Sequence, residues 1–345
     1  MALSSKELAR LVGVSPSAVS IALNNRPGIS SETRKKILFA ADEHGYENHK
    51  RQQNSTKSSI IQFVIYKKEN SRISHSQLLS SISEGIAYQT QKSGYSLQVS
   101  YLNDQSDMYT QVNYLKKCKC DGIILLASEI NEERMKIFES IDVPFVVLDN
   151  YFDNNKYDCI ISNNALGTKS ALKYLTDMGH KDICFLSSDF NCTNYRERRL
   201  AFSSQCLSNS QISHCANNII KSPCSTKDAY NTCVNYIKDN KHRLPSAIFA
   251  DNDLLASTCI SALADEGFNV PNDISIVGFG DYSLCQMFFP ALTSVHIPIH
   301  HLGSLSVRRL IKKMNGEAIE VLKIELATSL VIRNSVKNLN NTKMP

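Results

Sequence analysis

Residues 5–24 read SKELARLVGVSPSAVSIALN, a pattern that predicts two short helices joined by a tight turn. Apolar residues recur at helical spacing on both sides of Gly13, and glycine readily adopts the left-handed conformation that ends a helix. Ser15 stands where it can cap the second helix. Pro16 follows in the first turn, where its missing N–H group costs no hydrogen bond. The stretch therefore predicts a helix-turn-helix.

A third amphipathic segment follows, with Ser31 as its predicted cap, and it ends near Gly45 and Tyr46. Together the three segments predict an all-α domain over residues 1–46. A small helical bundle without a DNA partner would show the same apolar pattern. The commonest use of such a unit, however, is to place its second helix in the major groove of DNA.

The distribution of charge favours DNA. Residues 1–58 hold nine Lys or Arg and five Asp or Glu, a net charge of +4, whereas the whole 345-residue chain carries +5. The excess positive charge is therefore concentrated in the segment that would meet phosphates.

Six short motifs at fixed spacing resemble the headpiece of the lactose-repressor (LacI/GalR) family. They are KELARLVGVS (6–15), AVS (18–20), LN (23–24), PGIS (27–30), ETR (32–34) and GY (45–46). The resemblance implies a transcription regulator that binds a palindromic operator in double-stranded DNA as a homodimer, or as a tetramer.

The resemblance also implies which side chains contact DNA. The residues at the family's phosphate-contacting positions are Ser15, Ser20, Asn24, Thr33 and Tyr46. Those at its base-reading positions are Pro16, Ser17 and Ile21. Ile21 departs from the polar or basic residue usual there, so we expect it to contact a thymine methyl group or to pack against another helix.

Residues 47–59 contain no apolar side chain and are expected to form a solvated linker or hinge. The family usually carries here a short helix with a leucine that wedges into the minor groove. This segment has no leucine, so we expect less bending of the operator.

From residue 60 onward, short apolar runs alternate with amphipathic helical segments. This alternation predicts parallel β-sheets with helices on both faces. The length suits a two-lobed α/β domain over residues 60–335, with lobe 1 at about 60–161 plus 292–322, lobe 2 at about 162–291 plus 323–335, and a tail at 336–345. Apolar faces of the first lobe and the helix expected at residues 304–314 are candidate dimer surfaces.

Stretches of this region also resemble the family and its periplasmic-binding-protein-like relatives. They are CDGIILL (120–126), MGHKDI (178–183), RER (196–198), PSAIFADNDL (245–254), VPNDISIVGF (270–279) and PALTSV (290–295). The residues that match effector contacts are Arg198, Asn252 and Asp149. Arginine and asparagine suit the vicinal hydroxyls of a sugar. The residues alone also allow a surface ion pair for Arg198 and a helix cap for Asn252.

Three departures weaken the sugar interpretation. Gly280 stands where the family has an aspartate, although Asp281 is close enough in sequence to replace it. Ile297 replaces a common glutamine, and residues 76–79 lack the aromatic pair usual in the first lobe, unless Tyr66 or Phe190 supplies the stacking ring.

Composition excludes several classes. The first residues hold no apolar run long enough for a signal peptide or a membrane span, so we expect a cytoplasmic protein without a membrane partner. The eleven cysteines are scattered, and we expect reduced, mostly buried thiols and no metal site. No P-loop, nucleophile elbow or dinucleotide motif is present. We therefore expect a protein that is not an enzyme and that binds no cofactor.

These features predict a DNA-binding regulator, specifically a repressor of carbohydrate uptake or metabolism genes controlled by a sugar-like effector between the lobes. Two alternatives stay open. One is a sugar-binding module without a regulatory role, and the other is a regulator controlled by a protein co-effector.

Overall fold

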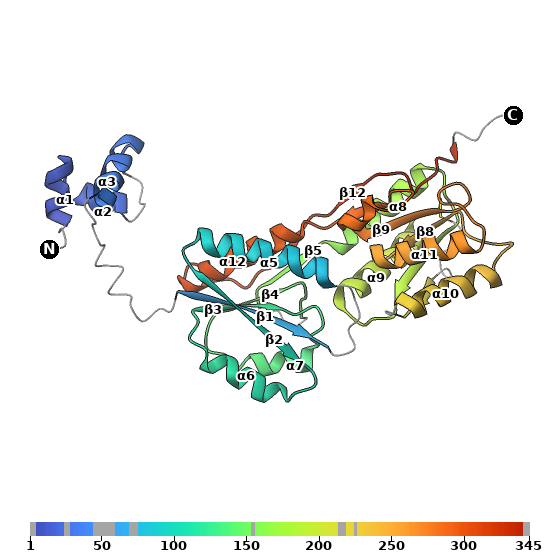
Figure 1. Ribbon diagram of the computed structural model, residues 1–345, viewed down its shortest axis with the longest axis horizontal. Coiled ribbons are helices and arrows are strands. Elements are labelled where there is room, and N and C mark those ends of the chain that lie inside the picture. The colour runs from blue at the N-terminus through green and yellow to red at the C-terminus, as the bar shows by residue number, and fades with distance from the viewer. Residues whose placement is uncertain are drawn as a thin grey trace. The chain divides into compact units, whose positions relative to one another are not determined.

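The computed structural model describes residues 5–23, 28–43, 59–68, 75–152, 156–212, 219–223 and 226–340. The chain divides into two compact units, Met1–Ser58 and Ser59–Pro345 (Figure 1). Two predicted DNA contacts, Asn24 and Tyr46, lie outside the described residues, as does all of the predicted linker except Ser59.

The first unit contains the three predicted helices, α1 (Ser5–Val12), α2 (Pro16–Leu23) and α3 (Ser31–Glu43). Gly13 has a φ of +71° and ends α1 as expected. Ser15 caps α2, since its Oγ accepts a hydrogen bond from the Ala18 N–H group at 3.2 Å. The three helices share a small apolar core, which contains Leu8, Ala9, Val19, Ala22, Ile37 and Ala41.

The cap of α3 corrects the sequence prediction by one residue. The Oγ of Ser30, not of Ser31, accepts the Thr33 N–H group at 3.1 Å. Ser31 is already the first helical residue, and the capping position precedes the first helical one.

The second unit is built from two six-stranded sheets, one in each lobe. The order in lobe 1 is β11-β5-β4-β3-β1-β2, with all strands parallel. The order in lobe 2 is β12-β10-β9-β8-β6-β7, where only β12 runs antiparallel to its neighbour β10. The lobe 1 strands are β1 (Ile60–Lys67), β2 (Ser96–Asn103), β3 (Gly122–Leu126), β4 (Phe145–Leu148), β5 (Cys159–Ser162) and β11 (Lys323–Leu326). The lobe 2 strands are β6 (Ile183–Ser188), β7 (Ile219–Ser222), β8 (Ala247–Ala250), β9 (Ser275–Gly280), β10 (Thr293–His296) and β12 (Ser329–Val331).

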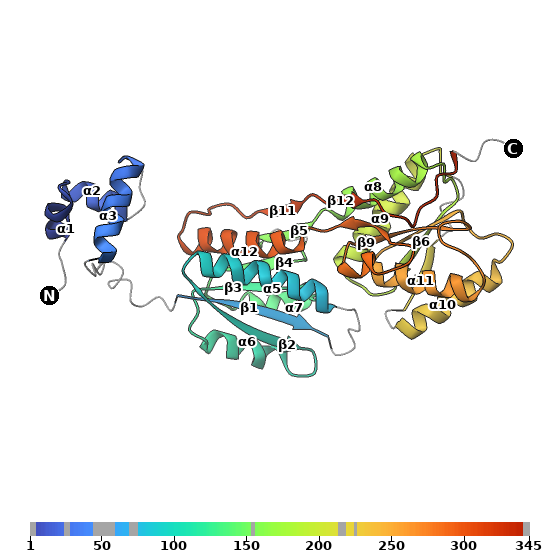
Figure 2. The same cartoon turned by 45° about the horizontal axis from the view of Figure 1, so that its top comes forward.

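Helices cover both faces of the lobe 1 sheet. Helices α5 (His75–Lys92) and α12 (Ile299–Met314) lie side by side on one face, with α6 (Met108–Lys117) and α7 (Glu132–Phe138) on the other (Figure 2). A Cβ atom on Gly85 of α5 would lie 2.1 Å from the His300 carbonyl oxygen of α12, so the close approach of the two helices requires glycine. One side of helix α12 is thus buried within the lobe, and the expectation that the helix contributes to a dimer surface stays a prediction.

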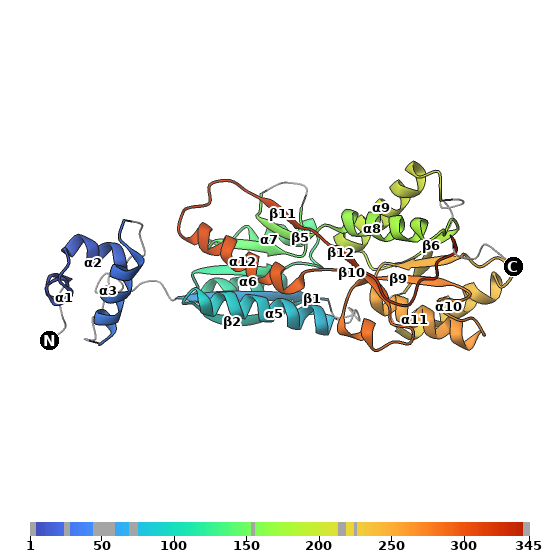
Figure 3. The ribbon, with the colours of Figure 1, turned by 90° about the horizontal axis from the view of Figure 1, so that it is seen from above.

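Lobe 2 repeats this arrangement. Helices α8 (Asn164–Asp177) and α9 (Thr193–Ser208) cover one face of its sheet, and α10 (Thr226–Asp239) and α11 (Asp253–Asp265) cover the other (Figure 3). No helix among the described residues is both long and apolar enough to cross a membrane.

The lobe boundaries differ from the prediction at the later crossovers. Strand β10, expected in lobe 1, pairs with β9 in lobe 2, and β11, expected in lobe 2, pairs with β5 in lobe 1. The chain therefore crosses between β5 and α8, between β10 and α12, and between β11 and β12. Part of the predicted tail also packs on lobe 2, where the Leu339 N–H group donates to the Met178 carbonyl at 2.8 Å.

The cysteines follow the prediction with one exception. Eight described cysteines are free, but Cys206 on α9 is disulfide-bonded, so the expectation of reduced thiols is wrong at this position. The two cysteines that remain, Cys215 and Cys224, lie outside the described residues.

Candidate functional site

The helix-turn-helix exposes four of the predicted DNA contacts at the start and on one side of its second helix. Ser15, Pro16, Ser17 and Ser20 are exposed at the start and along one side of α2, where residues three and four positions apart share a face. Thr33 is half-buried in the first turn of α3, and its hydroxyl lies 2.8 Å from the Ser30 hydroxyl.

Ile21 is half-buried on α2. Its Cδ1 lies near Gly28, where an added Cβ atom would be 3.6 Å away. The Arg34 guanidinium of α3 donates to the carbonyls of Ile21 and Ala22 at 3.4 and 3.3 Å and so satisfies the end of α2. The Ile21 side chain thus packs in part against its own unit and leaves an apolar edge exposed.

A cavity of about 80 Å³ lies between the two lobes of the second unit. Both lobes line it, near the carboxyl ends of their parallel strands, which is where open α/β sheets bind ligands. The lining residues are Gln77, Leu78, Ser128, Asp149, Ser188, Phe190, Cys192, Asn194, Tyr195, Arg198, Asn252, Leu254, Leu255, Phe279, Tyr282, Leu284 and Ile297.

Arg198 of α9 is the charged centre of this cavity. Its side chain is only 5% exposed, so the alternative of a surface ion pair is wrong. Its Nε donates to Asn164 Oδ1 at 2.8 Å, its Nη1 donates to the Asp251 carbonyl at 2.6 Å, and its Cζ lies 3.7 Å from the centre of the Phe279 ring. A guanidinium has five N–H donors. Two of them are used in these internal hydrogen bonds, so the others remain for a ligand.

Asn252 both caps a helix and lines the cavity. Its Oδ1 accepts the Leu255 N–H group of α11 at 2.9 Å, which confirms the cap, and its Nδ2 donates to Asp251 Oδ1 at 2.8 Å. Asp251 is fully buried, and this burial raises the pKa of its carboxyl to about 6, although the Ser188 N–H group, which donates at 2.5 Å, favours the charged form.

Asp149 joins the lobes. It follows β4 with a φ of +63°, and its carboxylate accepts hydrogen bonds from Ser128 of lobe 1 at 2.5 Å and from Asn194 of lobe 2 at 3.0 Å. A second contact between the lobes joins Gln77 Nε2 to Ser283 Oγ at 2.7 Å.

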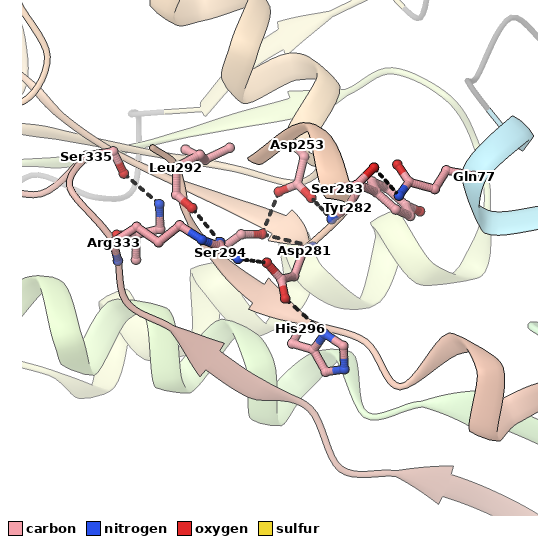
Figure 4. A network of polar contacts seen from close by, with 11 residues as sticks. Gln77, Asp253, Asp281, Tyr282, Ser283, Leu292, Ser294, His296, Arg333 and Ser335 are labelled. Carbon is pink, nitrogen blue, oxygen red and sulfur yellow. Dashed lines mark hydrogen bonds and ion pairs between the residues drawn. The ribbon is translucent and has the colours of Figure 1, made fainter. Parts of the chain in front are cut away.

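The structure corrects the prediction for Asp281, which does not line the cavity. Its carboxylate accepts from Arg333 Nη2 at 2.7 Å and lies 3.0 Å from His296 Nδ1, as Figure 4 shows. The positive φ values of Gly280 (+131°) and Asp281 (+57°) turn the chain at the end of β9 and direct this carboxylate toward the crossover segments.

The first-lobe aromatic pair is replaced from lobe 2. Phe190, Tyr195, Phe279 and Tyr282 line the cavity, whereas Tyr66 does not. Of these four rings, Phe190 alone was among the two predicted candidates for stacking, Tyr66 and Phe190. Asn164 and Asn194 were also missed, although asparagine directly after a buried strand or in a first helical turn is a signal for a site at the carboxyl edge of a sheet.

Known proteins match both units of the chain. Residues 5–48 match the model "Bacterial regulatory proteins, lacI family", and residues 172–336 match the model "Periplasmic binding protein-like domain". The HTH-type transcriptional repressors PurR of Histophilus somni (strain 129Pt) and Photobacterium profundum are each 29% identical over 97% of this chain and 99% of their own length.

Solved structures share the fold. The lac repressor dimer bound to operator and the anti-inducer ONPF has a TM-score of 0.69 at 23% identity, over 98% of this chain and 100% of that chain. The complex of the transcriptional regulator CelR with cellobiose has a TM-score of 0.71 at 20% identity, over 96% of this chain and 99% of that chain.

A helix-turn-helix unit followed by a two-lobed binding-protein domain defines a class of DNA-binding regulators of transcription. Within that class, the chain belongs to the LacI family of bacterial regulatory proteins.

Proposed function

We propose that the chain is a transcriptional repressor that binds a palindromic operator as a homodimer and is controlled by a small ligand between its lobes. The observation that carries this proposal is the buried Arg198, held in a cleft that two lobes share, in a chain that also presents an exposed DNA-reading helix. The protein is not an enzyme in this proposal, and because its partner is chromosomal DNA it acts in the cytoplasm.

The cavity supports control by ligand binding. Its volume of about 80 Å³ is well below the roughly 300 Å³ of a typical ligand pocket. A ligand the size of a sugar therefore fits wholly within this cavity only if the lobes or the lining side chains move apart. Such a ligand has different affinities for the two arrangements, which is the condition for shifting an equilibrium between them.

The lining supports a ligand with a hydrogen-bonding edge and a flat apolar face. Arg198 and Asn252 supply donors, while Phe190 and Phe279 supply rings on which such a face can stack. A sugar or modified sugar fits this description, so carbohydrate genes remain the proposed target. A thermal-shift screen that includes sugars and planar nitrogen heterocycles tests the ligand class, since stabilisation grows with ligand excess.

The exposed edge of lobe 1 supports a dimer of two copies. Strand β2 ends the sheet, and large side chains around it are exposed, namely Tyr88, Val99, Tyr101, Tyr109 and Tyr114. Exposed apolar patches on an unpaired edge usually mark an interface. Sedimentation equilibrium tests this assignment, with Tyr101→Glu expected to shift the protein toward the monomer.

Operator binding tests the regulatory role. DNA fragments captured from the source genome are titrated with the full chain at increasing salt. We expect specific binding whose logarithm falls linearly with the logarithm of the salt concentration, because phosphate contacts release counterions. Binding that does not respond to salt, or no specific fragment, contradicts the proposal and favours a ligand-binding module without a regulatory role.

A further inference from the structure

A second cavity, of about 380 Å³, opens from the same cleft. It shares Ser128 and Cys192 with the first cavity, so the two spaces adjoin. Its character differs, because charged and amide side chains from both lobes replace most of the aromatic lining. The other lining residues are Lys68, Glu129, Ile130, Asn131, Glu132, Asn150, Tyr151, Phe152, Asn191, Thr193 and Arg196.

Two cations approach this second cavity from opposite lobes. Lys68 directly follows β1 of lobe 1, and its Nζ lies 5.7 Å from the centre of the Phe190 ring of lobe 2. Arg196 belongs to the first turn of α9 in lobe 2 and is exposed. A group held by both side chains would therefore join the lobes.

The start of α9 adds positive potential to the same space. Cys192 occupies the capping position of α9 without a side-chain cap bond, and Asn191, Cys192 and Thr193 all line the cavity. The first N–H groups of a helix and its dipole both favour a negative charge at this end.

Two carboxylates also line the cavity. Both belong to lobe 1, whereas the two cations belong to different lobes. Glu129 is 4% exposed and accepts the Lys68 backbone N–H group at 2.6 Å, so this side chain is held within lobe 1. Glu132 is exposed in the first turn of α7, where a negative charge complements the helix dipole. The two cations line the cavity from different lobes, beside the positive end of α9, and this combination favours an anion over a cation as the bound group.

We propose that the second cavity binds a phosphate group, held between Lys68, Arg196 and the start of α9. The inference deepens the proposed function, because it assigns to the effector of the same cleft a phosphorylated end beside the part that contacts Arg198. Binding of this group draws the two lobes together, since its two cationic partners belong to different lobes.

The probe for this site is inorganic phosphate, titrated into the full chain without DNA at constant ionic strength by exchange against chloride. We expect phosphate to stabilise the wild-type protein and to slow amide hydrogen exchange at residues 193–195. Lys68→Ala and Arg196→Ala should each weaken this binding by about tenfold or more, because each removes a charge-assisted contact.

Two matched variants keep the result interpretable. Lys173→Ala removes an exposed cation of α8 that lines neither cavity, and phosphate binding should stay at the wild-type level. Glu132→Gln should leave the affinity unchanged or raise it, because it removes a like charge. A phosphate ion bound by the headpiece would be indifferent to all four substitutions.

Three results overturn the proposal. They are no phosphate-dependent change at residues 193–195, equal affinity in the wild type and in both cation variants, and loss of binding in Glu132→Gln alone. The readout uses no DNA, so a chain that binds phosphate here but no operator would refute the proposed function and leave this site standing. A ligand-controlled repressor that does not bind phosphate would refute the phosphate site and leave the proposed function standing.

Discussion

The two lobes have closely similar sheets but contribute unequally to the cleft between them. Lobe 2 supplies Arg198, which is fixed by Asn164 and by the Asp251 carbonyl, and Asn252, which is fixed by its capping bond. Lobe 1 supplies Gln77, Leu78, Ser128 and Asp149, and its polar side chains bond to each other or to residues of lobe 2. The difference indicates that lobe 2 holds a preformed binding surface and that lobe 1 closes over it.

The largest expected effect tests lobe 2 itself. Arg198→Ala removes the donors of Asn164 Oδ1 and of the Asp251 carbonyl in a buried site. We expect the free energy of unfolding to fall by about 3 kcal/mol and ligand affinity to fall at least 100-fold, because a buried charged donor is lost. Urea unfolding and calorimetric titration measure the two effects.

Arg199→Ala is the matched control for this variant. Arg199 is the next residue of α9, and its Nη1 donates to Ser187 Oγ at the long distance of 3.5 Å. Its ligand affinity should match the wild type. If Arg198→Ala bound ligand as tightly as Arg199→Ala, lobe 2 would not be the dominant half of the site.

The next prediction concerns Asp281, which should contribute to stability at the segments that cross between the lobes but not to ligand binding in the cleft. Asp281→Asn weakens the mostly buried contact with Arg333, and we expect the free energy of unfolding to fall by about 2 kcal/mol. Ligand affinity should change by less than about threefold, because Asp281 lies outside the cavity. A loss of affinity comparable to that of Arg198→Ala would show that Asp281 contributes to ligand binding after all.

Asp251, which accepts hydrogen bonds from Arg198 and Asn252 in lobe 2, should make the stability of the protein depend on pH. Burial raises the pKa of Asp251 from 3.8 to about 6, so the folded protein binds this proton more tightly than the unfolded chain does. Its contribution to stability therefore rises as the pH falls from 7 to 5, by about 1 kcal/mol, and is lost again as the pH rises through 6.

Comparison with Asp251→Asn isolates this group, because all other titrating groups are common to both proteins. The free energy of unfolding, measured at pH 5 and pH 7, should show a difference between wild type and variant that grows in favour of the wild type at pH 5. Parallel pH dependence in the two proteins would assign the proton uptake elsewhere.

The smallest effect belongs to lobe 1. Ser128→Ala removes one hydrogen bond to Asp149 at a half-buried position, so we expect the unfolding free energy to fall by about 1 kcal/mol or less. Ligand affinity should fall about threefold. An effect on affinity as large as that of Arg198→Ala would make the lobes equal partners and remove the contrast between them.

Most of the fold followed from local pattern. The caps and the glycine stop of the headpiece depend on residues next to one another, and the buried strands of both sheets are continuous apolar runs. The exchange of β10 and β11 between lobes was mispredicted because both are only four residues long, and pairing with β9 or β5 decides their lobe. No periodicity within four residues carries that information.

The site was predictable only in part. Arg198 and Asn252 were identified by family resemblance, and their side chains do line the cavity. Asp281 was misplaced because sequence distance says nothing about the positive φ values that turn its carboxylate away. Asn194 was missed because its role depends on Asp149, a residue 45 positions away in the other lobe.

A ligand held mainly by lobe 2 should set the affinity of the protein for DNA. This coupling is tested most directly by titrating the captured operator with wild type and Arg198→Ala, each with and without the ligand identified by thermal shift. We expect the ligand to change the wild-type dissociation constant by about tenfold, within the usual range of coupling between sites, and to leave that of Arg198→Ala unchanged. A wild-type protein that binds the ligand tightly yet keeps the same operator affinity would contradict the account.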